Sequence, residues 1–395
     1  QFDVCQRCHL QGNAVLKEEK SFFDFRPGMK LSDVMTLFLP KYEGAEDEFI
    51  MASHADRLKM SQCFINSSQG EKTLPSQKNG LTCVTCHNPH VSVKVTGKEV
   101  FNNACKNCHE EDDKAICSET QEIRNQKQNN CASCHMPKSG SIDIPHVTVT
   151  DHFIRKRTKK DEIKKINKFL GLYAVNEKNP SDKVKAEAYL NQFEKFDTEN
   201  FALLDSAQKY LTDKTVQDIQ PNFSLLIRLN YLRNDYRKII YFTEKIGKEK
   251  LLKEILTKKS YTNNDAWTCY RVGEAFMNNQ NHEEALIYFS KARELAPFNL
   301  EFKNKYAGTL FSVGKTDAAK KIYEEILKED PKYVAALGNM GYFYSLSDSK
   351  KALEFYDRAL TLDPDYQLVL INKIKLLVRL GRKNEANLLI KLIKK

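Results

Sequence analysis

The chain has 395 residues, a length that is enough for two or three domains. It carries 62 Lys and Arg against 52 Asp and Glu, a formal net charge of +10, and the positive excess lies after residue 150. No apolar run in the sequence approaches the roughly 18 residues of a membrane helix, so we expect no membrane span.

Four copies of the pattern Cys-x-x-Cys-His lie within the first 135 residues. This pattern is the attachment motif of c-type haem, in which two thiols form thioethers with the haem and the His ligates the iron. Zinc is the competing interpretation, but a zinc site does not need a His directly after the second Cys in every copy. We therefore predict four haem c groups. The predicted thioether residues are Cys5, Cys8, Cys83, Cys86, Cys105, Cys108, Cys131 and Cys134, and the predicted proximal iron ligands are His9, His87, His109 and His135.

A six-coordinate haem needs a second axial ligand, and the same region holds four further His residues. His90 follows His87 across Pro89, which stiffens the link, so we expect His90 to serve a different haem. The sequence leaves open which distal His serves which iron. The predicted distal iron ligands are His54, His90, His146 and His152. The methionine alternatives, which we interpret as packing residues, are Met51, Met60 and Met136.

Haem c is attached outside the cytoplasm, so we expect the protein to be exported, to the periplasm or to the cell surface. Gln1 stands only four residues before the first haem Cys, and we interpret it as a processed mature end or as a cut in a longer protein. In an oxidising compartment Cys63 and Cys117 are either a disulfide pair or two free thiols. Cys269 is expected in a helical core.

From about residue 161 the pattern changes to amphipathic helices, and three similar segments follow one another at 266–299, 300–333 and 334–366. Small and aromatic residues recur at the same sites, and the closing Pro residues are 34 and 33 positions apart. The pattern resembles the tetratricopeptide repeat, a helix-turn-helix in which small residues let the helices approach and aromatic residues fill the gap. The recurring sites are Gly273, Phe276, Ala285, Phe289, Ala292 and Pro297; Ala307, Leu310, Ala319, Tyr323, Ile326 and Pro331; and Gly341, Tyr344, Ala352, Tyr356, Ala359 and Pro364.

Two further stretches extend the helical region. An unfinished fourth copy contains Leu377, Gly381 and Ala386, and residues 234–238 resemble the inter-helix turn of a decayed copy. The predicted fold class is mostly α, with a loop-rich multihaem cytochrome c domain followed by an α-solenoid of tetratricopeptide-like helical hairpins. The predicted domains are a tetrahaem domain at 1–157, a helical region with degenerate repeats at 158–260 and tetratricopeptide repeats at 261–395.

The first part of the chain is similar to multihaem c-type cytochromes that carry a C-terminal tetratricopeptide region. The matching stretches are SHADRLKMSQC around His54, LTCVTCHNPH around His90, and CASCHMPKSGSIDIPHVTVTDHFIRK around His146 and His152. The resemblance implies bis-His haems that are close enough for electron hopping, outside the cytoplasmic membrane, and it implies the distal role for these four His residues. Such proteins often carry further haem motifs upstream of the position of Cys5.

Four haems with both axial positions filled conduct electrons but offer no open iron to a substrate. We therefore expect an electron carrier rather than an enzyme, with redox protein partners. The repeats would dock proteins or assemble copies of the chain, including into a filament. The alternative is a multihaem reductase of the nitrite or hydroxylamine type, although no Cys-x-x-Cys-Lys motif occurs. A third hypothesis is a binding protein with structural haems. Haem propionates would offset the positive charge, so we expect no nucleic-acid partner.

Overall fold

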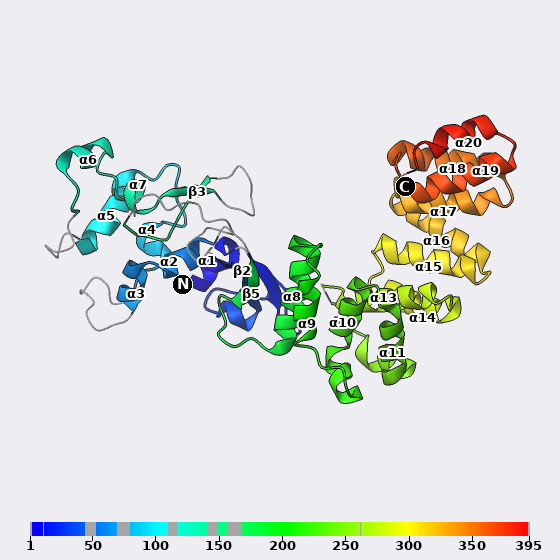
Figure 1. Cartoon of the computed structure of the whole chain (residues 1–395), viewed down its shortest axis with the longest axis horizontal. Helices are drawn as coiled ribbons and strands as arrows, with labels where there is room; N and C mark the ends of the chain where they lie inside the picture. The colour runs from blue at the N-terminus through cyan, green and yellow to red at the C-terminus, as the bar shows by residue number, and fades with distance from the viewer. Residues whose placement is uncertain are drawn as a thin grey trace. The chain divides into compact units, whose positions relative to one another are not determined.

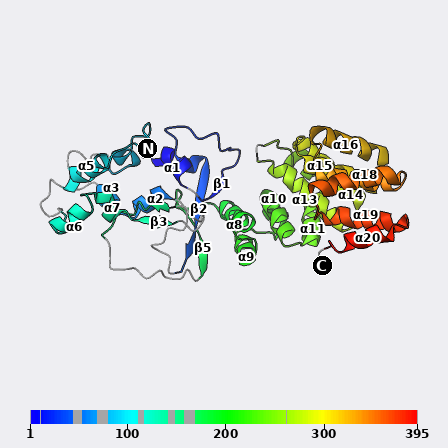
Figure 2. The same cartoon turned by 90° about the horizontal axis from the view of Figure 1, so that it is seen from above.

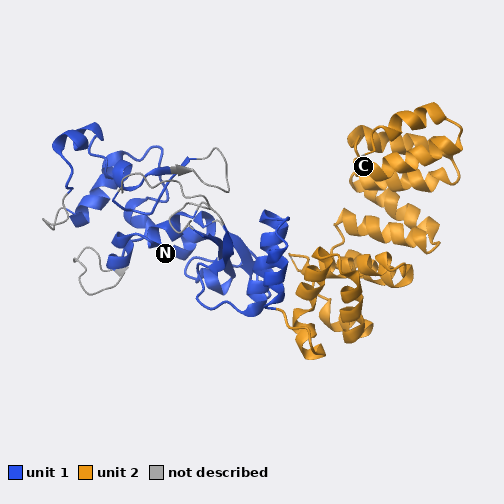
Figure 3. Ribbon diagram, viewed as in Figure 1, with its two compact units in different colours: residues 1–210 blue, residues 211–395 orange. Residues whose placement is uncertain are grey.

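The structure is a computed structural model of the chain (Figure 1). It divides into two compact units, residues 1–210 and residues 211–395 (Figure 3). Within them the structure describes residues 2–10, 12–43, 53–68, 80–109, 117–140, 148–156, 168–260 and 262–393.

Unit 1 combines short helices with two small antiparallel sheets. Its helices are α1 (Phe2–His9), the 3-10 turn η1 (Leu31–Asp33), α2 (His54–Lys59), α3 (Gln62–Ser68), α4 (Cys83–Cys86), α5 (Lys98–His109), α6 (Gln121–Gln126), α7 (Cys131–His135), α8 (Asp182–Phe196) and α9 (Ala202–Gln208). Its strands are β1 (Asn13–Leu16), β2 (Met35–Tyr42), β3 (Lys138–Gly140), β4 (Thr148–Thr150) and β5 (Phe169–Ala174).

The larger sheet has the strand order β1-β2-β5, with every pairing antiparallel. The register sets Phe38 of β2 opposite Asn13 on one side and opposite Ala174 on the other. Successive side chains of a strand point to opposite faces. Accordingly Leu37 packs in a cluster with Leu10 and Leu31, whereas Phe38 packs in a second cluster on the other face. The central strand is thus covered on both faces, and its first six residues are buried.

Helix α8 covers the second face of this sheet, as Figure 2 shows from above. Val184 and Ala188 of α8 pack against Val15 and Phe38. The buried side-chain amide of Asn13 donates a hydrogen bond of 2.6 Å to the carbonyl of Ala188. Unit 1 therefore extends to residue 210, because β5 and α8 complete a sheet that begins at residue 13.

The described residues between 80 and 156 have little apolar packing of their own. No described hydrophobic residue between residues 59 and 183 is buried, although the stretch contains apolar side chains. Val91, Val93, Val95 and Val100 are 43%, 58%, 75% and 54% exposed. The side chains that would ordinarily form a core are thus at the surface of this part of unit 1.

Unit 2 is built from helical hairpins in chain order. Its helices are α10 (Val216–Leu232), α11 (Tyr236–Ile246), α12 (Lys248–Lys250), the π-helical turn η4 (Leu251–Ile255), α13 (Asn264–Asn278), α14 (His282–Leu295), α15 (Leu300–Ser312), α16 (Thr316–Glu329), α17 (Val334–Ser345), α18 (Ser349–Leu362), α19 (Gln367–Arg379) and α20 (Lys383–Ile390). The mostly helical class and the solenoid-like hairpins agree with the sequence prediction.

The turns between the paired helices follow local sequence. Asn234 has a positive φ of 55°, a conformation that Asn tolerates, and the next residue, Asp235, caps α11 by accepting a hydrogen bond from the backbone of Lys238. The predicted inter-helix turn therefore lies at residues 233–235, and residues 236–238 already belong to α11. At the unfinished last copy Gly381 takes the same role with a φ of 74°.

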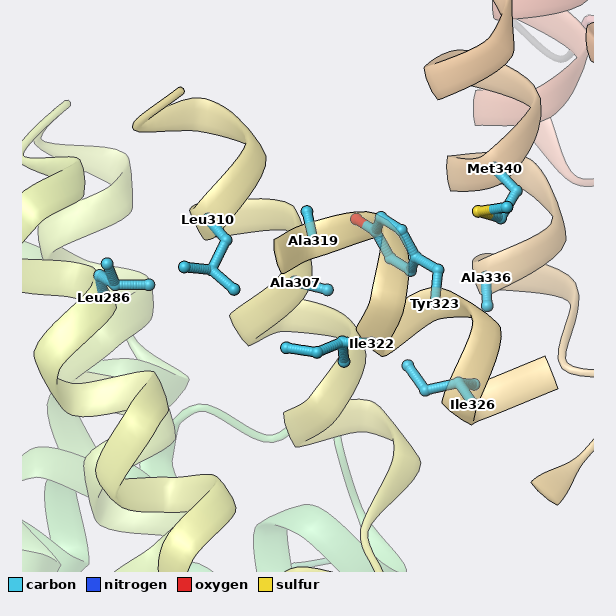
Figure 4. Packing of buried hydrophobic residues seen from close by; sticks show 9 residues of the cluster. All are labelled: Leu286, Ala307, Leu310, Ala319, Ile322, Tyr323, Ile326, Ala336 and Met340. Carbon is cyan, nitrogen blue, oxygen red and sulfur yellow. The ribbon is translucent and has the colours of Figure 1, made fainter. Parts of the chain in front are cut away.

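The small residues and the aromatic residues meet between the two helices of each hairpin. A Cβ atom at Gly273 would lie 2.8 Å from the Phe289 ring, and one at Gly341 would lie 2.5 Å from the Tyr356 ring. Successive hairpins then share one core, which Figure 4 shows from close by. That cluster joins α14, α15, α16 and α17 through Leu286, Ala307, Leu310, Ala319, Ile322, Tyr323, Ile326, Ala336 and Met340.

Candidate functional site

Four of the predicted iron ligands lie together in unit 1. The ring centres of His9 and His54 are 6.5 Å apart, those of His54 and His152 are 4.4 Å apart, and those of His87 and His152 are 6.1 Å apart. They come from α1, from the first residue of α2, from the end of α4 and from the segment after β4. Residues separated by more than 140 positions thus form one cluster of imidazoles.

A buried ion pair joins the two segments that carry His54 and His152. Arg57 on α2 donates from Nε and Nη2 to the two carboxylate oxygens of Asp151, at 2.9 and 2.6 Å, and the two side chains are only 6% and 4% exposed. Ser61 adds a second connection, since its Oγ accepts from the Ile154 backbone at 2.8 Å. The His54–His152 ring contact is therefore held by polar interactions outside the rings.

Arg57 and Asp151 are not among the functional residues that the sequence predicts. Each lies close in sequence to a predicted ligand, Arg57 three positions after His54 and Asp151 directly before His152. Both residues also lie in the stretches that resemble multihaem cytochromes, but their pairing is a tertiary contact between partners 94 positions apart.

Burial sets the protonation of three of the clustered imidazoles. It lowers the pKa of His54 to about 4, with the neighbouring His152 and His9 as further causes. Burial also lowers the pKa of His87 and of His152. These three rings are therefore neutral at neutral pH, which is the form of His that binds metal ions.

Two of the rings are oriented by backbone carbonyls. Nδ1 of His152 lies 2.9 Å from the carbonyl oxygen of Thr150, and Nδ1 of His135 lies 3.1 Å from that of Arg155. A carbonyl oxygen can only accept, so Nδ1 donates in both rings, and in the neutral ring of His152 Nε2 carries the lone pair. Metal-ligating His residues in proteins commonly show this arrangement.

The motif cysteines are also brought together in pairs. The Cys83 thiol interacts with that of Cys5, and burial, the larger cause, raises its pKa to about 11. The Cys105 thiol interacts with that of Cys131, and burial raises its pKa to about 12. The first motif thus neighbours the second and the third neighbours the fourth, and Cys86 of the second motif also interacts with Cys105 and Cys108 of the third.

Asn102 connects the third and fourth motifs. Its buried side chain donates to the Asn129 carbonyl at 2.9 Å and accepts from the Cys131 backbone at 3.0 Å. Asn102 lies on α5 and Cys131 begins α7, so the side-chain amide of Asn102 joins the helices that carry the third and fourth motifs. The sequence contained no signal for this residue.

Two further predicted site residues, His90 and His109, are exposed. His90 is exposed, and its backbone amide is bonded to the Asn88 side chain at 3.0 Å. His109 is exposed at the end of α5. His146 falls outside the described residues, so its predicted role is not addressed by the structure.

The structure contains no disulfide between Cys63 and Cys117, because both thiols are free. Cys63 is half-buried, and burial, with a smaller contribution from nearby Cys108, raises its pKa. Cys117 is exposed. The eight motif cysteines are free thiols in the same way, so the choice between a disulfide and two free thiols stays a prediction.

A pocket of about 600 Å³ lies beside the first motif. This volume is within the range of about 300–1,000 Å³ that is usual for small-molecule and cofactor sites. The thiol-bearing residue Cys8 contributes to its wall, as do two cationic residues. Its lining is Arg7, Cys8, Leu10, Gly12, Ala14, Phe22, Met35, Leu37, Lys195 and Phe196.

Within the described ranges, no group of three or more His, Cys, Asp or Glu residues is arranged to hold a metal ion by itself. Nor is any helix of the described chain long and apolar enough to cross a membrane.

Two segments of unit 2 match family models of known repeats. Models of the tetratricopeptide repeat match residues 268–299 and residues 309–366. The C-terminal region of this chain therefore contains tetratricopeptide repeats, at the positions of the three predicted copies. Repeats of this class form extended surfaces that bind protein segments.

Two curated proteins are similar over short stretches. The uncharacterized protein ycf37 of Pyropia yezoensis is 44% identical over 54 residues, which are 13% of this chain and 30% of that protein. Tetratricopeptide repeat protein 37 of Xenopus laevis is 32% identical over 116 residues, which are 26% of this chain and 7% of that protein. The chain thus spans less than a third of the length of either relative.

Solved structures are similar at lower identity. YrrB, described as a tetratricopeptide-repeat protein with an unusual peptide-binding site, is 21% identical; the match covers 48% of this chain and 91% of YrrB, with a TM-score of 0.36. MamA from Desulfovibrio magneticus RS-1 is 19% identical, over 46% of this chain and 93% of MamA, with a TM-score of 0.33.

Proposed function

We propose that the protein is an electron carrier that works outside the cytoplasm, with four haem c groups in unit 1 and a tetratricopeptide-repeat region that docks protein partners. The observation that carries the proposal is the combination of four Cys-x-x-Cys-His motifs with a cluster of four imidazoles from separate parts of the chain, three of them partly buried and neutral. Attachment of haem c takes place outside the cytoplasm, which is the basis for the proposed location.

The residues of unit 1 fit haem in their chemistry. Each motif supplies two thiols for thioethers and one imidazole for the iron. The clustered His54, His87 and His152 are neutral, as ligation requires. Nε2 of His152 carries the lone pair, because its Nδ1 donates to a carbonyl oxygen, and Nδ1 of His135 donates to a carbonyl oxygen in the same way.

The apolar surface of the haem-motif region supports the same proposal. Val91, Val93 and Val95 are exposed, and the described part of residues 80–156 contributes no buried hydrophobic side chain. Burying such side chains contributes about 25 cal/mol per Å² of apolar area. The planar faces of haems would supply the apolar partner that this stretch lacks in its own side chains.

When bound, each haem supplies a one-electron redox centre whose potential depends on its axial ligands. The chain's part is to fill both axial positions, which keeps substrates from the iron and favours lower potentials than His/Met ligation. We assign the proximal positions to His9, His87, His109 and His135 and the distal positions to His54, His90, His146 and His152.

The repeat region gives the electron carrier a means of docking. Tyr342 and Leu346 at the end of α17, and Leu368 and Val378 on α19, expose 44%, 62%, 54% and 52% of their surfaces. Apolar side chains at such positions are available to a protein segment or to another copy of the chain. Redox partners and assembly into a homo-oligomer or filament belong to this proposal.

Haem stoichiometry and spin state test the proposal. The full chain, produced with a cytochrome c maturation system, is assayed by pyridine haemochromogen absorbance and by EPR of the oxidised form, then reduced and exposed to carbon monoxide. Four low-spin haems per chain without carbon monoxide binding are expected. One high-spin haem that binds carbon monoxide would support the reductase alternative, and a chain without covalent haem would refute the haem assignment.

A further inference from the structure

Two pairs of imidazoles have the separation of ligands on opposite sides of one metal ion. A His nitrogen lies about 2.0 Å from a first-row metal ion and about 1.1 Å from its own ring centre, so two opposed ligands have ring centres about 6 Å apart. The ring centres of His9 and His54 are 6.5 Å apart, and those of His87 and His152 are 6.1 Å apart. Both separations agree with that value.

The contact between His54 and His152 is shorter than the other two. The rings of His54 and His152 are 4.4 Å apart, which is too close for an iron between them. Each of these two rings already has a motif His at the separation of an opposed ligand. The short contact is therefore between ligands of two different sites.

One interaction between motif cysteines also brings the first two motifs together. The Cys5 thiol interacts with the Cys83 thiol, so the first and second attachment motifs adjoin each other independently of the imidazoles. The buried Arg57–Asp151 pair then fixes the two segments that carry the remaining two rings.

We propose that His54 is the distal ligand of the haem on the first motif, opposite His9, and that His152 is the distal ligand of the haem on the second motif, opposite His87. The two haems are neighbours, and their distal ligands are in contact. Arg57 and Asp151 are positioning residues for that contact. The assignment rests on the proposed function, since it requires haem on both motifs.

Ligand exchange in the haem-loaded full chain tests the pairing. His54→Met and His152→Met each replace one distal imidazole by a thioether. Each variant then contains one His/Met haem, with a raised potential and the long-wavelength absorption band of oxidised His/Met haem c. His282→Met, in unit 2, is the matched control and produces no such band.

Each exchange is combined with removal of one attachment motif. In the Cys5→Ala, Cys8→Ala background, the band of His54→Met is lost and the band of His152→Met is retained. Removing the second motif, through its two Cys residues, has the reverse effect. The pairing is overturned if the band of His54→Met depends on the second motif and that of His152→Met on the first, which is a crossed pattern. It is also overturned if the bands survive the removal of either motif.

The outcomes separate this inference from the function on which it rests. A parent protein without covalent haem refutes the proposed function, whereas a parent with four haems and a crossed pattern refutes only the pairing. Where a motif-deleted protein fails to mature, a cryo-EM structure of the haem-loaded full chain shows the ligands directly. An iron on the first motif that is ligated by a residue other than His54 overturns the proposal.

Discussion

At the scale of single residues, the polar interactions that shape the imidazole cluster lie outside the cluster itself. The guanidinium of Arg57 and the carboxylate of Asp151 are almost fully buried and meet through two hydrogen bonds. Phe153 lies against the same guanidinium, with its ring centre 5.2 Å from the guanidinium carbon. A charge in such a place is tolerated only with its partner, so the pair makes the approach of the two segments specific.

Replacing Asp151 by Ala should destabilise unit 1 by about 3–5 kcal/mol, because the buried guanidinium of Arg57 loses this carboxylate. Urea denaturation measures the loss. The matched control is Glu249→Ala, which removes an exposed partner 3.7 Å from Lys253 and should cost no more than about 1 kcal/mol. Equal effects of the two substitutions would show that the buried pair is not a special determinant of stability.

Close packing at Gly341 leads to a second prediction. A Cβ atom there would lie 2.5 Å from the Tyr356 ring, so Gly341→Ala should destabilise unit 2 by about 1–3 kcal/mol. At Gly308, also inside a helix, the nearest atom would be the Tyr323 hydroxyl at 3.4 Å, an ordinary contact. Gly308→Ala should therefore be neutral or stabilising by up to about 1 kcal/mol, through helix propensity.

Thermal unfolding followed by circular dichroism compares these two glycine variants. A Gly341→Ala protein as stable as the Gly308→Ala protein would mean that the hairpin of α17 and α18 can open without cost.

At the scale of elements, side-chain hydrogen bonds stabilise short helices of unit 1 that are too short to be stable by themselves. Helix α7 has only five residues, and isolated helices much shorter than about 12 residues are not stable in water. Its first residue, Cys131, is bonded to Asn102 of α5, and its cap, Asn130, accepts from the Ser133 backbone. Tertiary and capping hydrogen bonds, rather than intrinsic helix propensity, therefore explain why α7 is helical.

Removing the Asn102 side chain should destabilise α7. Asn102→Ala deletes one donor and one acceptor from a buried site, at a cost of about 1–3 kcal/mol. Hydrogen exchange of the amides at residues 129–135 should accelerate. Asn103→Ala, at the exposed neighbouring position, is the control and should leave that exchange unchanged. Unchanged hydrogen exchange in the Asn102 variant would show that the Asn102 hydrogen bonds do not stabilise α7.

At the scale of the whole molecule, the division of the chain depends on the sheet of unit 1. Strand β5 pairs with β2, Asn176 bonds to the backbone of Met35 and Leu37, and α8 covers the sheet. These contacts extend unit 1 well past the last haem motif. The tetratricopeptide hairpins then belong to a second unit with its own core.

Two truncations test this division. A chain of residues 1–210 should fold, bind haem with the spectrum of the full chain and lose binding to partners or to itself, because it retains the whole sheet and lacks the repeats. A chain of residues 1–157 should fail to fold, since it lacks β5 and α8. Circular dichroism, haem content and negative-stain microscopy are the measurements. A well-folded 1–157 chain would contradict the structural boundary.

The sequence by itself determined those features whose information is local. The repeats in unit 2 are visible because each hairpin carries its own small residues and aromatic residues at a fixed spacing, and because Asn234 and Asp235 specify a turn without reference to distant residues. The four haem motifs are local in the same sense, and the haem that they predict remains a proposal for the measurements described above.

Only the tertiary structure decided which distant residues meet. The pairing of β2 with β5, the Arg57–Asp151 ion pair and the grouping of His9, His54, His87 and His152 join segments that lie tens to more than a hundred residues apart. No periodicity in the chain encodes such contacts. They follow from burying apolar surface and satisfying buried charge in one three-dimensional arrangement.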